Sequence, residues 1–234
     1  TLASLSVGAV SGTQTLVVNA RTLDTSGFDV LAANGIIRFE NGARYVAGIR
    51  SEQRGVIAMN VAGTLVVDNA TVGKDLSVSG DVIARGTSVF SGFVTVNAGG
   101  ELSAEATMTS PAGISLQNNL SLLGTLSLTS DAANQDVALT MAGASTINNF
   151  GTLVSEGSQG TRLIDGLLAN AAGVLQVDYP LVITKMSGTQ NNDGQIIIND
   201  SSLTYDLAGG SFSMGSTGQV DVQGDGLFML RDGT

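Results

Sequence analysis

Asn149-Phe150-Gly151-Thr152-Leu153 starts a pattern that recurs twice more within residues 143–234. The second copy is Asn170-Ala171-Ala172-Gly173-Val174-Leu175, and the third is Asn191-Asn192-Asp193-Gly194-Gln195-Ile196. The leading asparagines are spaced by 21 and 21 residues, and the glycines Gly151, Gly173 and Gly194 by 22 and 21. Turn residues that recur at a nearly fixed period indicate that one coil of chain is laid on the next.

The segments between these turn residues have the period of β-strands. Residues 174–177, 181–184, 196–198 and 203–207 are short, rich in β-branched side chains, and apolar at alternate positions. That alternation is typical of a strand with one buried face. No window keeps the apolar spacing of an amphipathic helix. The sequence therefore predicts an all-β fold, a parallel β-solenoid with coils of about 21 residues, each roughly 4.8 Å above the last.

The same turn chemistry runs through the whole chain, so we expect residues 1–234 to form a single elongated β-solenoid domain. At about 21 residues a coil, roughly 10 to 11 coils would make a rod on the order of 50 Å long. The sequence begins and ends in the middle of the pattern, which suggests a fragment or processed part of a longer chain.

Asparagine at one corner of successive coils can hydrogen-bond along the stack, as in asparagine ladders. We therefore predict a structural ladder at one corner of the coil. Its members would be Asn149, Asn170 and Asn191.

Residues 36–55 are less regular. Asn41-Gly42 between two apolar segments reads as the turn of a hairpin-like pair. Four of the ten basic residues fall here: Arg38, Arg44, Arg50 and Arg54. The simpler interpretation is a solvated edge or loop. The functional one is a contact patch for an acidic neighbour or an anionic glycan.

Composition excludes several classes of function. The net charge of −10 argues against a nucleic-acid partner, because phosphate binding needs a basic face. The chain has no Cys and no His, which removes disulfides, thiolate metal sites and Ser-His catalysis. No apolar run reaches 18 residues, so we expect no membrane insertion.

Carboxylates are the remaining candidates for chemistry. Asp178, Asp200 and Asp221 are spaced by 22 and 21 residues and could share a face, although the apolar pattern instead pairs Asp178 with Asn199. A glycosidic catalytic pair needs a groove and binding subsites, and the aromatic content is only 4%. We therefore expect surface aspartates and predict no catalytic residue.

Calcium is a softer alternative, because three aspartates near the end of the chain offer hard oxygen ligands. They are Asp221, Asp225 and Asp232. The calcium-binding nonapeptide of other β-rolls is missing from the sequence. We therefore predict no metal site and no cofactor.

The last coil carries four large apolar residues, namely Phe212, Met214, Phe228 and Met229. The sequence favours core positions for them. The alternative is an exposed apolar end that stacks on another coil.

Residues 150–234 resemble the right-handed β-helix repeats of large bacterial surface proteins, such as filamentous-haemagglutinin-like exoproteins and autotransporter passengers. The resemblance rests on the first two repeats quoted above, together with Gly210-Ser211-Phe212 and Gly224-Asp225-Gly226-Leu227. It implies a right-handed parallel β-helix that serves as an extracellular stalk or adhesin. Residues 72–80, together with the segment 36–55, also look like phage tail-fibre shafts.

These observations lead to the hypothesis of a non-catalytic structural or adhesive module at the cell surface. Its partners would be itself, neighbouring coils of a longer chain, or a surface glycan or protein. A phage fibre or spike that binds a host glycan is the first alternative, with a virion location. A β-helix polysaccharide lyase or hydrolase is the second.

Overall fold

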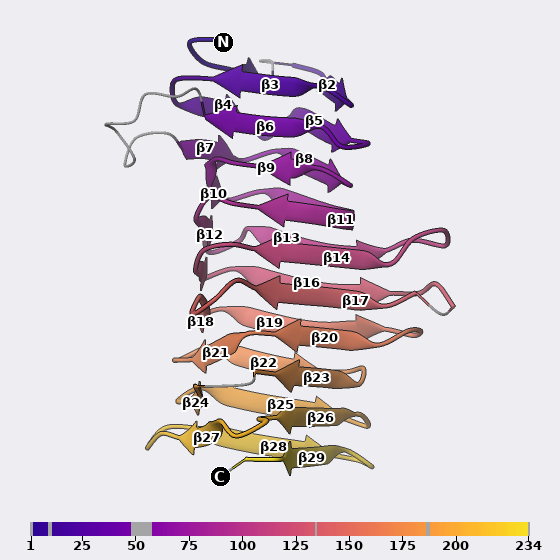
Figure 1. Cartoon of the computed structure of the whole chain (residues 1–234), viewed down its shortest axis with the longest axis vertical. Helices are drawn as coiled ribbons and strands as arrows, with labels where there is room; N and C mark the ends of the chain where they lie inside the picture. Colours follow the sequence, from indigo (N-terminus) through magenta and orange to yellow (C-terminus); the bar gives the residue numbers. More distant parts are fainter. Residues whose placement is uncertain (1, 9–10, 48–57, 134, 186–187, 234) are drawn as a thin grey trace.

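The computed structural model describes residues 2–8, 11–47, 58–133, 135–185 and 188–233. Over these residues the chain forms 29 β-strands and no helix. The strands stack into a rod with the first coil at one end and the last at the other (Figure 1). The predicted all-β solenoid is confirmed.

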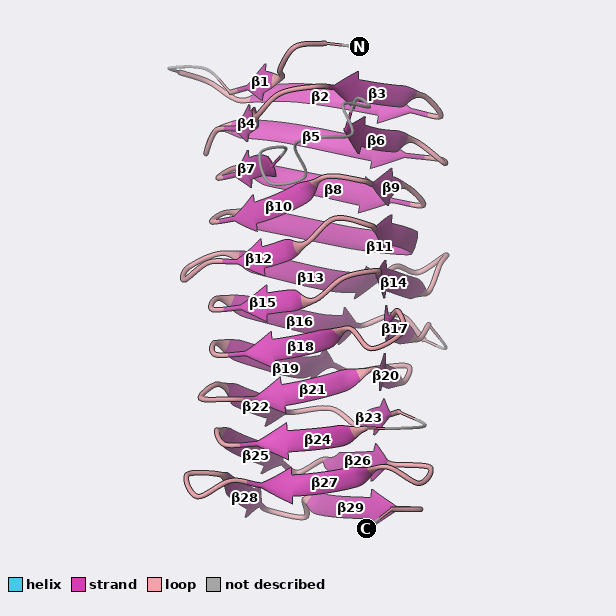
Figure 2. Ribbon diagram, turned by 60° about the vertical axis from the view of Figure 1, so that its left-hand side comes forward, coloured by secondary structure: helices cyan, strands magenta, loops and turns pink. Residues whose placement is uncertain are grey.

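Each coil contributes one strand to each of three sheets, which we call A, B and C (Figure 2). Sheet B consists of β1 (Ser6–Val7), β4 (Asp29–Leu31), β7 (Ala58–Val61), β10 (Asp75–Val78), β12 (Val94–Val96), β15 (Leu120–Leu122), β18 (Thr146–Asn149), β21 (Leu167–Asn170), β24 (Thr189–Asn192) and β27 (Ser211–Met214).

Sheet C consists of β2 (Gln14–Asn19), β5 (Gly35–Glu40), β8 (Thr64–Asp68), the first half of β11 (Asp81–Phe90), β13 (Glu101–Ala106), β16 (Thr125–Ser130), β19 (Thr152–Gly157), β22 (Val174–Val177), β25 (Gln195–Asn199) and β28 (Gln219–Gln223). Sheet A consists of β3 (Thr22–Thr25), β6 (Arg44–Ala47), β9 (Thr71–Val72), the second half of β11, β14 (Ala112–Leu116), β17 (Val137–Met141), β20 (Arg162–Asp165), β23 (Leu181–Thr184), β26 (Ser202–Asp206) and β29 (Leu227–Arg231).

Every ladder between these strands is parallel and joins a strand to its counterpart in the next coil, for example β16 to β19 and β19 to β22. Sheets A and C are continuous at β11, which turns the corner at Gly86 with a φ of 56°. The two sheets share β11. They do not close into a β-barrel, because every hydrogen-bonded ladder joins a strand to its counterpart in the next coil along the rod.

Coil length varies more than the repeat predicts. Thr152 pairs with Val174, and Val174 with Gln195, so these steps are 22 and 21 residues. The step from Thr64 to Asp81 is only 17 residues. The coils lie about 24 residues apart on average. About nine turns separate the first and the last of the ten strands in each sheet, which is close to the 10 to 11 coils predicted. The strands keep their register while the corner loops absorb the difference.

The hairpin predicted near Asn41-Gly42 is wrong, although the turn itself is present. Asn41 and Gly42 both have positive φ, and the N–H of Ala43 donates to Glu40 O across 3.1 Å. β5 nevertheless pairs with β2 and β8, while β6 pairs with β3 and β9. The turn is a corner between sheets C and A, and β5 and β6 are regular; the rest of the segment 36–55 lies outside the described residues.

The core is made of like residues stacked along the rod. Leu102, Leu126, Leu153, Leu175 and Ile196 pair in register through sheet C, and none of them has exposed surface. Burial of one such side chain contributes about 1.5–3 kcal/mol. The alternation predicted from the sequence thus supplies a continuous apolar interior.

Candidate functional site

A buried ladder of asparagines crosses three successive coils of sheet B. The Asn149 amide donates to Asn170 Oδ1 across 2.8 Å and to Val174 O across 3.1 Å. The Asn170 amide repeats this pattern one coil on, donating to Asn192 Oδ1 at 2.6 Å and to Gln195 O at 3.1 Å. Asn149, Asn170 and Asn192 have no exposed surface. Their amides therefore tie each coil to the next inside the core.

The predicted third member, Asn191, is wrong by one residue. Asn170 is in register with Asn192, whereas Asn191 pairs with Ala169 on the outer face and is exposed. Adjacent residues of a strand point to opposite faces, so a one-residue slip exchanges inside for outside. Asn191 and Asn192 are consecutive in the sequence. The equal spacing of 21 residues alone favoured Asn191 over Asn192.

Apolar side chains terminate the ladder. Asn149 is in register with Leu122 of the preceding coil, and Asn192 with Met214 of the following one. The Asn192 amide donates to Gln219 O at 3.2 Å and contacts Met214 Sδ at 3.7 Å. The ladder is thus a local structural device.

The four arginines do not make one described patch. Arg38 lies on β5 in sheet C, where Nε pairs with Glu40 Oε1 at 2.7 Å, and Arg44 lies on β6 in sheet A. Both are exposed, on different sheets of the rod. Arg50 and Arg54 lie outside the described residues. An acidic partner at this position stays a prediction.

The three aspartates spaced by 22 and 21 residues do not form a row. Asp178 accepts a hydrogen bond of 2.5 Å from Asn199, so the register follows the apolar pattern. Asp200 sits in a corner with a φ of 46° and accepts from the Asp225 N–H at 3.0 Å. Asp221 is in register with Ile197. The three carboxylates therefore have separate surroundings and separate partners.

Among the described residues, no three acidic side chains converge in a way that could hold a metal ion. This includes the candidates Asp221, Asp225 and Asp232. The Asp221 carboxylate instead accepts a 2.8 Å hydrogen bond from the Gln223 amide two residues along the same strand.

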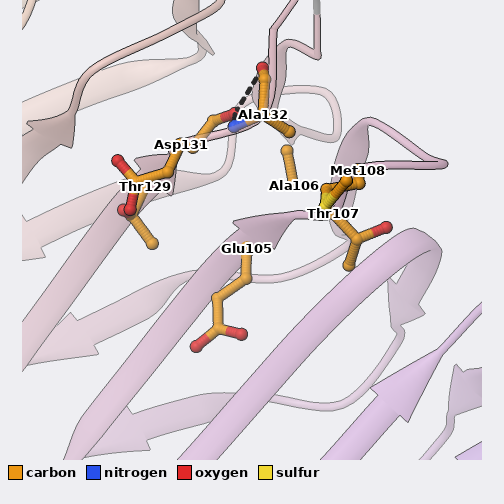
Figure 3. Close-up of a pocket in the computed structure, with 8 residues that line it drawn as sticks. Glu105, Ala106, Thr107, Met108, Thr129, Asp131 and Ala132 are labelled. Carbon is orange, nitrogen blue, oxygen red and sulfur yellow. Dashed lines mark hydrogen bonds between the residues drawn. The ribbon is translucent and has the colours of Figure 1, made fainter.

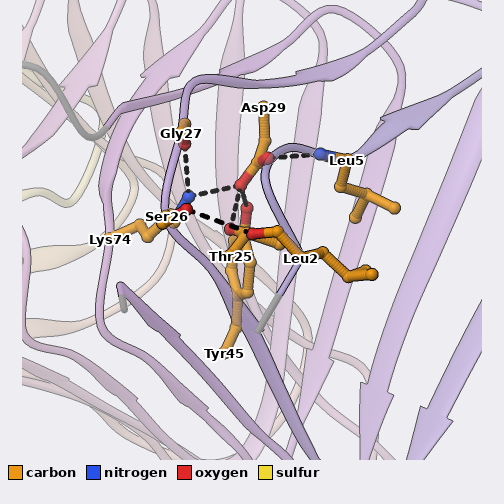
Figure 4. A network of polar contacts seen from close by, with 8 residues as sticks. All are labelled: Leu2, Leu5, Thr25, Ser26, Gly27, Asp29, Tyr45 and Lys74. Carbon is orange, nitrogen blue, oxygen red and sulfur yellow. Dashed lines mark hydrogen bonds and ion pairs between the residues drawn. The ribbon is translucent and has the colours of Figure 1, made fainter. Parts of the chain in front are cut away.

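A buried charge cluster lies in the N-terminal coils of the rod (Figure 4). It was not predicted from the sequence. The Asp29 carboxylate accepts hydrogen bonds from Lys74 Nζ and the Tyr45 hydroxyl, from Thr25 Oγ1 at 2.5 Å, and from the Leu5 N–H at 2.5 Å. Lys74 Nζ also donates to Gly27 O at 2.8 Å and lies 5.2 Å from the centre of the Tyr45 ring. The Asp29, Lys74, Tyr45 and Thr25 side chains are buried.

The burial and hydrogen bonds of this cluster shift the pKa values of Asp29 and Tyr45. Burial alone would raise the pKa of the Asp29 carboxyl, but the hydrogen bonds from Lys74, Thr25, Tyr45 and Leu5 outweigh it and lower the pKa below its ordinary value. Burial, together with the Asp29 carboxylate, raises the pKa of Tyr45. The cluster is therefore a satisfied ion pair that joins coils distant in sequence. Its sequence signal was Lys74, a lone lysine in a strand-rich segment.

A second buried cation, Arg162, stands under the loops between sheets C and A. Its guanidinium donates to Leu128 O at 3.2 Å, Ser130 O at 2.9 Å, Gln159 O at 2.5 Å and Glu156 O at 2.5 Å, and it lies 4.5 Å from the Tyr179 ring centre. Burial lowers the pKa of Arg162 below its ordinary value, and the charges of Tyr179 and nearby carboxylates offset this only in part. The guanidinium therefore ties the end of β16 to the end of β19 and to the loop that follows β19.

A hollow of about 460 Å³ opens beside these loops (Figure 3). Its lining includes two carboxylates, but both have partners: Glu105 pairs with Arg85 at 2.8 Å, and Asp131 accepts from Ser158 at 3.2 Å. Met108 on its rim is 88% exposed. Its described lining contains no aromatic platform for a sugar ring. The hollow offers hydroxyl and methionine contacts and no arranged acid–base pair.

The sequence favours core positions for four large apolar residues of the last coil. Phe212 and Phe228 are partly buried around Tyr205, with ring centres 4.9–6.0 Å apart. Met229 is partly exposed and Met214 is 48% exposed. None of the four is fully buried.

Comparisons of the chain with protein-family models, curated proteins and solved structures give no match. None of the described segments forms a helix with the length and apolar character needed to span a membrane.

Proposed function

We propose that this chain is a non-catalytic structural module of an extracellular β-solenoid, a stalk or filament segment of the kind found in bacterial surface β-helix proteins. Its role is reach and surface contact. Its partners are neighbouring coils, with a surface glycan or protein as a further contact.

The observation that carries the proposal is the placement of the polar ties. The asparagine ladder, the Asp29–Lys74 cluster and the Arg162 anchor each join one coil to another inside the rod. The groups with shifted pKa values in the described chain are Asp29, Tyr45, Arg162 and Tyr205, and all four side chains are buried. A catalytic acid or base would instead have to face a cleft.

Single-molecule pulling tests the proposed role as a stalk. A stalk module should unravel coil by coil, in steps of roughly 80 Å for about 24 residues of extended chain. A single collapse at the lowest loads would contradict the role. Separately, incubation with acidic and neutral polysaccharides should yield no new reducing or unsaturated ends, and release of either would overturn the non-catalytic assignment.

A further inference from the structure

The charges of this acidic chain are unevenly distributed around the rod. From β10 to β27, the strands of sheet B contain one charged residue, Asp75. The strands of sheet C over the same coils contain six: Asp81, Arg85, Glu101, Glu105, Glu156 and Asp221. The strands of sheet A over these coils contain four: Arg162, which is buried, Asp165, Asp206 and Arg231. Sheet B therefore has the fewest charged residues of the three sheets in a protein with a net charge of −10.

The outer surface of sheet B has a regular row of small residues along its middle. Seven residues pair in unbroken register from coil to coil: Ser77, Thr95, Ser121, Asn148, Ala169, Asn191 and Ser213. All seven are at least partly exposed. Hydroxyl and amide groups both donate and accept hydrogen bonds, so a row of them can pair with a copy of itself.

Two large apolar side chains lie exposed beside this row, at the corner between sheets B and C. Leu123 is 48% exposed, and Phe150, at the same corner of the next coil, is 53% exposed. The Phe150 N–H donates to Leu122 O at 2.8 Å, which fixes the two corners next to each other. At the opposite edge of the sheet Phe93, directly before β12, is 54% exposed. Asp193 is exposed at the corner after β24. Exposed apolar side chains on a face with few charges are typical of a contact site.

We propose that sheet B is the interface of an antiparallel homodimer of this rod. We infer that the occupant is a second copy of this chain. Two chains of net charge −10 repel each other where their acidic faces meet, but sheet B brings few charges together, so two copies can associate through it. Charged residues are also depleted at the cores of protein interfaces. The proposal goes beyond the stalk role proposed above and does not depend on it.

The symmetry follows from the apolar corner. A two-fold axis across the rods places each corner of sheet B opposite its own counterpart and reverses the coil order. With the axis between β15 and β18, Leu123 of one copy lies opposite Phe150 of the other. In the same arrangement Ser121 faces Asn148, and Thr95 faces Ala169. A parallel pair of rods would leave the Leu123–Phe150 corner against the opposite edge of the sheet.

The size of the face fits a reversible dimer. With the axis between β15 and β18, β27 faces β7, so eight coils meet, from β7 to β27. At about 4.8 Å a coil, with a strand and its corners about 18 Å wide, they give roughly 700 Å² per copy, or about 1,400 Å² in total. That area is in the lower part of the range for a specific interface, so we expect micromolar association.

Sedimentation velocity over about 1–200 µM tests the proposal. The wild-type chain should shift from 23.6 kDa to twice that mass. Asn148→Asp replaces an amide with a carboxylate near the axis and should weaken dimerisation at least tenfold, since two carboxylates would be desolvated close to the symmetry axis. Gln159→Glu makes the same change of charge at an exposed loop position between sheets C and A, away from sheet B, and should alter the affinity less than twofold.

Orientation is tested by a spin label at Ser213→Cys. The antiparallel dimer separates the two labels by seven coil steps, about 34 Å. A chain that stays monomeric to 200 µM, a trimer, equal effects of both carboxylate variants, or a short label distance would each overturn the proposal. The proposal would also be overturned if the chain is monomeric and binds an uncharged polysaccharide surface, and if Asn148→Asp abolishes that binding. A monomeric result would leave the proposed stalk role untouched, because that role is measured by pulling.

Discussion

Replacement of Asn170 by alanine should remove the centre of the buried amide ladder. Asn170 accepts from Asn149 at 2.8 Å and donates to Asn192 at 2.6 Å and to Gln195 O at 3.1 Å. Alanine leaves one donor and two acceptors without partners where neither neighbour has exposed surface. At about 1–2 kcal/mol for each orphaned group, we expect a loss of about 3–6 kcal/mol in the free energy of unfolding.

Asn191→Ala is the matched control, because Asn191 lies on the outer face of the same strand as Asn192. It should cost about 0.5 kcal/mol or less. The cost of Asn192→Ala should lie between these two values. It removes only the acceptor of one Asn170 N–H and the donor to Gln219 O.

Denaturant titration by circular dichroism measures the cost, and amide hydrogen exchange shows where the damage lies. Both are needed, because repeat proteins do not always unfold in one cooperative step. Exchange should accelerate in β18, β21 and β24 first. The reasoning is refuted if Asn170→Ala stays within about 0.5 kcal/mol of the wild type, or if Asn191→Ala costs as much.

Three further predictions concern the buried charges. Lys74→Met leaves the Asp29 carboxylate buried without its cation and should cost about 3–5 kcal/mol in a denaturant titration, with much of the loss recovered by Asp29→Asn in the same chain. The folded-state pKa of Asp29 is lowered, so its contribution to stability is complete above the unfolded value of about 3.9 and disappears as pH falls through the folded pKa. Thermal melts below pH 4 should therefore fall less steeply for Asp29→Asn than for the wild type, and identical slopes would contradict this. Arg162→Met removes the donors to four backbone carbonyls and should cost about 2–4 kcal/mol, with limited proteolysis moving to the loops 131–133 and 157–161; unchanged cleavage there would exclude the anchor.

The sequence predicts what repeats and misses what does not. Alternating apolar residues and recurrent glycines predict the stacked strands, because both are local signals repeated in every coil. Asn41-Gly42 also predicts its turn correctly, but a tight turn forms equally well at a hairpin or at a solenoid corner. The choice between them depends on strands β2 and β8, which come from other coils.

Register and buried charge required the structure. Asn191 and Asn192 are chemically identical neighbours, and only the pairing with Asn170 decides which one is inside. Lys74 and Asp29 are 45 residues apart, and Arg162 binds carbonyls 32 and 34 residues before it. No local pattern links such positions, because the coil lengths between them vary.

Double spin labelling along sheet C measures the stacking most directly, and the absence of native cysteine makes it straightforward. Thr15, Asp81 and Gln219 are exposed on strands of sheet C, and the coil register places Asp81 six steps and Thr15 nine steps from Gln219. The Asp81→Cys/Gln219→Cys pair should then give about 29 Å and the Thr15→Cys/Gln219→Cys pair about 43 Å. Distances that fail to grow with the number of coils would contradict a stacked rod.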